Sequence, residues 1–135
     1  MKRYHAHVYF EEDQVDQARE LYQKIEQSFL LDEVNPYGFH AVKIGPHPLP
    51  MFEIHFDEES NIKATSWLIQ NRRGFSVLIH EDTGDDVKDH SENIFWIGKP
   101  VIIDFEFFEK IKTNPELRIH PEKGTENEKT CTSLL

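Results

Sequence analysis

Strict alternation of apolar and polar side chains in several short segments is the feature that most constrains the fold of this chain. Residues 3–10, RYHAHVYF, place His5 and His7 on one side and the small and apolar residues on the other. Side chains alternate across a β-strand with a period of two, so each such segment has one apolar face. The pattern recurs in residues 51–56 (MFEIHF) and 75–81 (FSVLIHE). We therefore predict strands that bury one face in a core.

Two other stretches have the three- and four-residue spacing of an amphipathic helix. The first covers about residues 13–30, and the second covers about residues 61–72 and ends before Gly74. Between them, Asn35-Pro36-Tyr37-Gly38 predicts a turn. A further strand is expected at about 39–44.

The order strand, helix, strand, strand, helix, strand predicts an α+β fold of the ferredoxin-like βαββαβ type. One antiparallel sheet, with strand order 4-1-3-2, is then covered by two helices. On the second strand, His40, Val42 and Ile44 are expected to share a face.

Residues beyond the fourth strand are harder to interpret. We predict a short helix at 84–92 and an apolar segment, IFWIG, after it. Val101–Phe108 is interpreted as a fifth strand or as a segment that packs against a partner. The predicted division is a domain over 1–108 with a polar, flexible C-terminal tail over 109–135.

Composition limits the classes of function. The chain has 135 residues, 38% of them hydrophobic, which suffices for one domain with a single core. Its net charge of −10 repels phosphate backbones and anionic lipid, so we expect neither nucleic acid nor a membrane as a partner. The single cysteine, Cys131, fits a reducing cytoplasm. No nucleophile elbow, dinucleotide fingerprint or P-loop occurs.

The polar faces of the predicted strands carry several of the histidines. In the expected strand order, His5 and His7 lie between Glu53 and His55 on one side and His80 on the other. Neighbouring strands are about 4.8 Å apart, and same-face residues on one strand are about 7 Å apart. Imidazoles at such spacings can bind one ion together. The alternation therefore indicates a metal site on the sheet face that the helices leave open.

Two more histidines flank this face. His47 lies in the proline-rich loop GPHPLP (45–50), and His90 follows the fourth strand. A rigid loop holds a ligand or catalytic group at little entropic cost. His90 also fits a plain polar residue of a short helix.

The other polar residues have alternatives too. A His-X-His pair in a strand is compatible with rings that are merely exposed or packed. His55 fits a dimer interface or a support for a ligand, and Glu53 fits a ligand, an acid/base or an orienter of an imidazole. His40 and His120 are interpreted as structural or surface residues.

Four motifs, in order, resemble the DOPA 4,5-dioxygenase family of fungi and bacteria: YHAHVYF (4–10), GPHPLPMFEIHF (45–56), LIHEDTGDDVKDH (78–90) and FWIG (95–98). The resemblance extends from residue 4 to about residue 108. It implies a ferredoxin-like fold, a homodimer, and extradiol cleavage of the catechol ring of DOPA by non-haem Fe(II) and O₂. The histidines of the family motifs fall on His5, His7, His47, His80 and His90, and Asp85 and Asp86 also match.

Within this resemblance, His7, His47 and His80 are the favoured metal ligands. They come from the central strand, the rigid loop and the neighbouring strand. His5, Glu53 and His90 are expected to be catalytic. The expected cofactor is Fe(II), with zinc or another divalent metal as a substitute in purified protein, and the expected partners are a small aromatic diol, O₂ and a second copy of the chain.

A non-catalytic homodimer that binds a metal or small ligand on the same scaffold is the alternative. A structural site is closed by four protein ligands, whereas a catalytic site keeps open positions. A third interpretation keeps the scaffold but not DOPA, since a fold does not determine its substrate. Candidate aromatic walls of the site are Tyr9, Phe52, Tyr37 and Trp96, with core packing favoured for Phe52 and Trp96.

Overall fold

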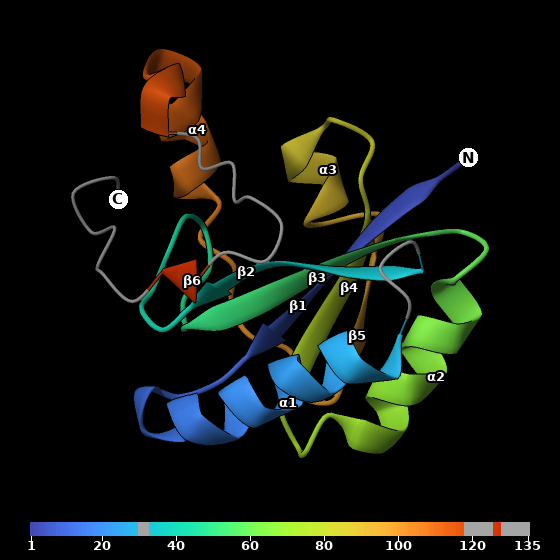
Figure 1. Cartoon of the computed structure of the whole chain (residues 1–135). Helices are drawn as coiled ribbons and strands as arrows, with labels where there is room; N and C mark the ends of the chain where they lie inside the picture. Colours follow the sequence, from blue (N-terminus) through green and yellow to red (C-terminus); the bar gives the residue numbers. More distant parts are fainter. Residues whose placement is uncertain (30–32, 118–125, 128–135) are drawn as a thin grey trace.

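The computed structural model describes residues 1–29, 33–117 and 126–127 (Figure 1). A βαββαβ unit is followed by a C-terminal extension. The strands are β1 (Arg3–Tyr9), β2 (Val34–His40), β3 (Met51–Asp57), β4 (Ser76–Glu81), β5 (Ile94–Ile97) and β6 (Glu126–Asn127). The helices are α1 (Val15–Ser28), α2 (Asn61–Asn71), α3 (Asp86–Asp89) and α4 (Glu106–Thr113), with 3-10 turns η1 (Glu12–Gln14) and η2 (Pro115–Leu117).

The sheet has the order β5-β4-β1-β3-β2-β6. Its central part has the predicted order 4-1-3-2, and β1 pairs antiparallel with both β3 and β4. Helices α1 and α2 lie on one side of the sheet, while α3 and α4 lie on the other (Figure 1). The predicted α+β fold of the ferredoxin-like type is confirmed.

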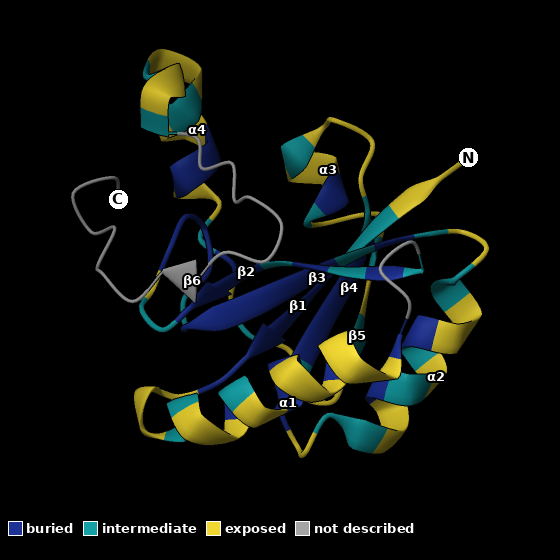
Figure 2. Ribbon diagram, viewed as in Figure 1, coloured by how far each residue is buried: buried dark blue, intermediate teal, exposed yellow. Residues whose placement is uncertain are grey.

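The side of the sheet toward α1 and α2 holds the larger apolar core. The alternation places Val8 of β1, Ile54 of β3 and Val77 of β4 in this core, where Leu21 and Leu68 of the two helices meet them. Figure 2 shows the inner strands as buried and the outer surfaces of α1 and α2 as partly exposed. Burying one face of each strand leaves the histidines of β1 and β4 on the opposite face.

The second strand differs from the prediction. Strand β2 begins at Val34 and ends at His40, so Asn35-Pro36-Tyr37-Gly38 lies within the strand and not in a turn. The register with β3 shifts between Pro36 and Gly38, and this irregularity accommodates a proline that cannot donate a backbone hydrogen bond. Because the strand ends at His40, Val42 and Ile44 do not continue its face.

The expected strand at Val101–Phe108 is also wrong, whereas the alternative, a segment that packs against a partner, stays a prediction. The fifth strand is β5, and residues 101–105 run without regular structure into α4. The Asp104 N–H donates to the Pro46 carbonyl at 2.8 Å, which ties this segment to the proline-rich loop. Phe107 and Phe108 of α4 then pack against Tyr9, Met51 and Leu78, on the open side of the sheet. The segment covers its own sheet because Phe107, Phe108 and Ile111 form one apolar helical face.

The remaining boundaries concern the end of the chain. The division at residue 108 falls inside α4, which continues to Thr113. Most of the predicted flexible tail lies outside the described residues, so this tail stays a prediction. None of the described helices is long and apolar enough to cross a bilayer.

The position of the core predicts that two isoleucines contribute very differently to the free energy of unfolding. Ile54 is 1% exposed in the core, and Ile62 on α2 is 80% exposed. Ile54→Ala should lower the free energy of unfolding by about 2–5 kcal/mol, because it removes buried methyl groups and leaves a cavity. The matched Ile62→Ala change should stay within about 0.5 kcal/mol. Urea unfolding measures both, and equal losses would contradict this assignment of the core.

Candidate functional site

The histidines gather in one cavity on the side of the sheet away from α1 and α2. Its volume is about 370 Å³. Seven of the eight histidines of the chain line it: His5, His7, His40, His47, His55, His80 and His90. The eighth, His120, lies outside the described residues. The cavity reaches the surface near Asp82, whose side chain is 45% exposed.

Strand pairing brings the central histidines together. His5 of β1 lies directly opposite His55 of β3 and His80 of β4. His7 lies opposite Glu53 of β3. The structure therefore places these five side chains on the same face, as the alternation predicts.

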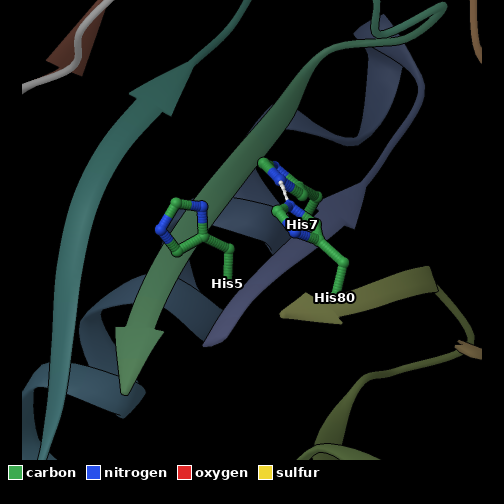
Figure 3. Close-up of side chains that lie close together, drawn as sticks. All are labelled: His5, His7 and His80. Carbon is green, nitrogen blue, oxygen red and sulfur yellow. Dashed lines mark hydrogen bonds between the residues drawn. The ribbon is translucent and has the colours of Figure 1, made fainter. Parts of the chain in front are cut away.

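A short contact between two rings joins His7 and His80 at the centre of the site. Their Nε2 atoms are 3.0 Å apart, and both side chains are buried (Figure 3). The Nδ1–H of His80 donates to the Glu81 carbonyl at 2.9 Å, because a carbonyl can only accept. The Nε2 of His80 then carries a lone pair that is directed at His7. His5 lies beside this pair in Figure 3.

The proline-rich loop brings His47 to the same cluster. The ring centroids of His47 and His7 are 4.4 Å apart. The Oη of Tyr9 lies 2.7 Å from Nδ1 of His47. When Nδ1–H donates to this oxygen, Nε2 of His47 is left with a lone pair. A tyrosine on β1 thus orients a histidine from a loop.

Helix α3 brings His90 from the other side. Its ring centroid lies 4.4 Å from that of His80, and its Nδ1–H donates to the Asp86 carbonyl at 2.7 Å. The buried carboxylate of Asp89 fixes the preceding loop, because it accepts from the Thr83 backbone N–H at 2.8 Å and from the Thr83 hydroxyl at 2.6 Å. The sequence predicts no role for Asp89.

Three groups of described side chains have ligand atoms that all lie within 4.8 Å of one another. They are His5, His7 and His80; His7, His47 and His90; and His5, Glu53 and His55. His7 belongs to two of these groups. The expected ligand set of His7, His47 and His80 draws on both, and no single group among the described residues contains His47 together with His80.

The electrostatics of the cluster favour neutral imidazoles. Burial, followed by the effect of neighbouring histidines, lowers the pKa of His7 well below 6.5 and the pKa values of His47 and His80 to about 3. Burial also lowers the pKa of His90. Neutral imidazole is the form that binds a metal, and the Nδ1 atoms of His47, His80 and His90 already have partners outside the cluster. The donor set therefore fits a divalent transition metal.

A carboxylate lies at the edge of the cluster. Burial raises the pKa of Glu53, but the hydrogen bond from His55 and the nearby histidines outweigh it and lower the pKa to about 2. His55 Nε2–H donates to Glu53 at 2.9 Å, and His5 Nδ1 lies 3.8 Å from the same oxygen. Burial and then His55 lower the pKa of His5 to about 4. An ionised carboxylate thus lies beside a neutral imidazole at pH 7.

The ring of His55 lies between those of His5 and Tyr37. Each neighbouring ring has its centroid 3.7 Å from that of His55. This stack holds His55 in the orientation that donates to Glu53.

The apolar walls differ from those expected. None of Tyr9, Phe52, Tyr37 and Trp96 is among the described residues that line the cavity. Phe52 lies in the core, as favoured, and Trp96 packs beside Tyr9. The walls are instead Ile44, Met51, Phe107, Phe108 and Ile111. Phe107 and Phe108 of α4 are visible in the sequence as an aromatic pair. The interpretation of 101–108 as a strand does not identify them as walls of the cavity.

His40 also lines the cavity, although the sequence suggests a structural or surface role for it. It is the last residue of β2 and is buried. A surface role is therefore wrong.

Comparisons with known proteins place the chain in a family. The model of the Dopa 4,5-dioxygenase family matches residues 4–107. An uncharacterised 21.2 kDa protein of Botryotinia fuckeliana is 31% identical over 118 residues, which are 79% of this chain and 63% of that protein. A DOPA 4,5-dioxygenase of Amanita muscaria is 27% identical over 104 residues, which are 73% of this chain and 46% of that protein. This chain therefore spans less than two thirds of the length of either relative.

A solved structure has the same fold. The crystal structure of a candidate dioxygenase from Nostoc punctiforme superposes with a TM-score of 0.70 at 30% sequence identity, and the match covers 82% of this chain and 94% of that one. The family match extends from the first strand into α4 and includes the histidines of the cavity. This chain therefore belongs to the Dopa 4,5-dioxygenase family.

Proposed function

We propose that this protein is an extradiol ring-cleaving dioxygenase, which uses a histidine-held Fe(II) and O₂ to open a catechol such as DOPA. Membership of a dioxygenase family supports an oxygenase. The observation that carries the proposal is the pair of buried Nε2 atoms of His7 and His80, 3.0 Å apart in a cavity that reaches the surface. The Nε2 lone pair of His80 accepts the Nε2–H of His7 when both rings are neutral, and a cation bound between the two rings would take the place of that proton.

We assign the metal to His7, His47 and His80. His7 is the member that the two all-histidine groups share, and His47 and His80 each have Nδ1 engaged by a partner outside the cluster. Three ligands leave coordination positions for a diol and O₂. Fe(II) bound there would act as a Lewis acid on the diol oxygens and supply electrons to O₂. Both oxygen atoms enter the ring-opened product, so no external reductant is required.

The remaining polar residues of the cavity accept and return protons or stabilise the groups that do so. His5 is neutral at pH 7 and lies 3.8 Å from Glu53 and 3.4 Å from Asp82, so either carboxylate stabilises the imidazolium that forms when His5 accepts a proton from the diol. Glu53 is kept ionised by His55. His90 has its Nδ1–H on the Asp86 carbonyl, and its Nε2 is available to return a proton to the product.

The cavity suits a small aromatic substrate. A volume of about 370 Å³ is at the lower end of the range for small-molecule sites, which starts at about 300 Å³. Phe107 and Phe108 offer an apolar wall to the ring, and the histidines offer polar contacts to the hydroxyls. Catechols other than DOPA also fit this description, and a cytoplasmic homodimer is the form that we propose for the enzyme.

A closed structural site is the second candidate. The rings of His7, His47, His80 and His90 lie next to one another, with neighbouring ring centroids 4.4–5.9 Å apart. Four imidazoles that all bind one zinc ion would leave no open position. A non-catalytic metal-binding homodimer would have this arrangement.

Single substitutions separate the two candidates. Protein reconstituted anaerobically with Fe(II) should turn catechol or DOPA yellow when O₂ is admitted. His7→Gln, His47→Gln and His80→Gln should each weaken metal binding by about tenfold or more. His90→Gln should keep the metal but lose most of its turnover. Metal analysis and product absorbance measure the two effects, and urea unfolding shows that each variant is folded.

Other outcomes would change the proposal. Loss of metal in all four variants, with no turnover by the wild-type protein, indicates the closed structural site. Retention of metal by both His7→Gln and His80→Gln would refute the assignment of the centre.

A conservative substitution tests whether the Tyr9 hydroxyl orients His47 for metal binding. Tyr9→Phe removes the hydroxyl that lies 2.7 Å from His47 Nδ1 while keeping the ring. The loss of such an orienting partner weakens metal binding by about 10–100-fold. Tyr4 lies on the opposite face of β1, where it stacks on Phe56, so Tyr4→Phe is the matched control. Competition with a metal-binding dye measures both affinities, and equal values for the two variants would exclude this role of Tyr9.

A further inference from the structure

His40 has hydrogen-bonding capacity that the described protein does not use. The side chain is only 3% exposed, and neither Nδ1 nor Nε2 has a hydrogen-bond partner among the described residues. Buried polar atoms are almost always paired, and an exception calls for an explanation such as a ligand. Because His40 lines the cavity, a ligand there can reach it.

The register of the sheet places His40 away from the proposed metal ligands. His40 of β2 is opposite Met51 of β3, and Met51 is opposite Tyr9 of β1. His7 is one same-face step from Tyr9, so His40 and His7 are separated by two strand spacings across the sheet and one step along it. The distance between their Cα atoms is then roughly 12 Å. A single aromatic ring at the centre leaves room for a substituent that extends toward His40.

The charges in the cavity define the group that His40 would bind. The described lining includes Glu53, Asp82, Asp86 and Asp89 but neither lysine nor arginine. An ammonium group would find carboxylates without His40. A carboxylate has no lysine or arginine to bind among the described lining residues, so it needs a free N–H donor away from the aspartates. The aspartates follow β4, whereas His40 ends β2, on the far side of β1 and β3. Met51 lies opposite His40, and the apolar lining residues Ile44 and Phe107 belong to the same cluster as Met51.

We propose that His40 is a specificity-determining residue, which hydrogen-bonds a carboxylate on the ring substituent remote from the two hydroxyls. This inference rests on the proposed dioxygenase function. Burial lowers the pKa of His40, with an opposing effect of Glu53, so the ring of the empty site is neutral and carries one N–H. An N–H donated to a carboxylate makes a stronger hydrogen bond than one donated to a neutral acceptor. The imidazole also gains the option of accepting a proton to match the negative charge.

Three catechols that differ at the end of a short ring substituent test the contact. They are 3-(3,4-dihydroxyphenyl)propionate, dopamine and 4-ethylcatechol, which end in a carboxylate, an ammonium and a methyl group. For the Fe(II)-loaded enzyme, His40→Leu should lower kcat/KM for the carboxylate about 10–100-fold more than for 4-ethylcatechol. The loss should fall mainly on KM. His40→Gln, which keeps an N–H donor, should recover part of the selectivity.

The other results overturn the inference. Equal losses for all three catechols mean that His40 only supports the cavity. A loss of kcat/KM that is confined to dopamine means that His40 binds an ammonium group. Unchanged kcat/KM values for all three catechols in His40→Leu mean that its nitrogens contact no part of the substrate.

Calorimetry separates this inference from the dioxygenase proposal. If the wild-type protein opens none of the rings, the dioxygenase proposal fails, and binding of 3-phenylpropionate and of 3-phenylpropanol to the metal-loaded protein then tests His40 alone. A preference for the carboxylate that disappears in His40→Leu supports the contact. Equal binding of both ligands by the wild-type protein rejects it.

Discussion

The antiparallel pairing of β1 with β3 and β4 is the interaction on which both the core and the site depend. It places Val8 in the core and His7 in the cavity from adjacent positions of one strand. A slip of one residue in this register would move every side chain of β1 to the other face. The histidines would then enter an apolar core without partners, at a high cost in free energy. The burial of the core therefore also aligns His5 with His55 and His80.

A cluster of buried polar groups persists here in part because three of its imidazoles are anchored from outside it. The Glu81 carbonyl holds His80, the Asp86 carbonyl holds His90, and Tyr9 holds His47. These contacts determine which nitrogen of each ring is directed inward. Nδ1 of His7, by contrast, is buried and has no hydrogen-bond partner among the described residues, a cost that the packing of the sheet must offset. Such a conflict between local stability and burial is typical of functional sites.

The sequence predicts the residues whose positions follow from periodicity. Alternation alone places His5, His7, Glu53 and His80 on one face, because β1, β3 and β4 are regular strands without a bulge. It does not place His47 and His90, which lie on loops; for these two residues the prediction depends on the resemblance to a family. A period of two has no meaning outside a strand.

The errors have a common cause, which is tertiary context. Pro36 is accepted within β2 because the register shifts there, and no local signal distinguishes this from a turn. The same misplacement of β2 conceals His40, since its burial depends on where the strand ends and on what covers that end. Residues 101–108 are apolar enough for a strand, but the Asp104 N–H bonds to Pro46 in a distant loop and the chain turns into α4. Long-range contacts override local propensity at each of these places.

Helix α4 converts an open sheet face into a cavity. In a βαββαβ unit one face of the sheet lacks helices, and here Phe107 and Phe108 cover part of it beside the histidines. The polar centre and its cover therefore come from different parts of the chain. Backbone pairing within the sheet holds the histidines of β1 and β4, whereas the apolar walls depend on a short helix tied at Asp104. Substitutions in α4 can consequently reshape the cavity for another ring without disturbing those histidines, which is how one scaffold acquires different substrates.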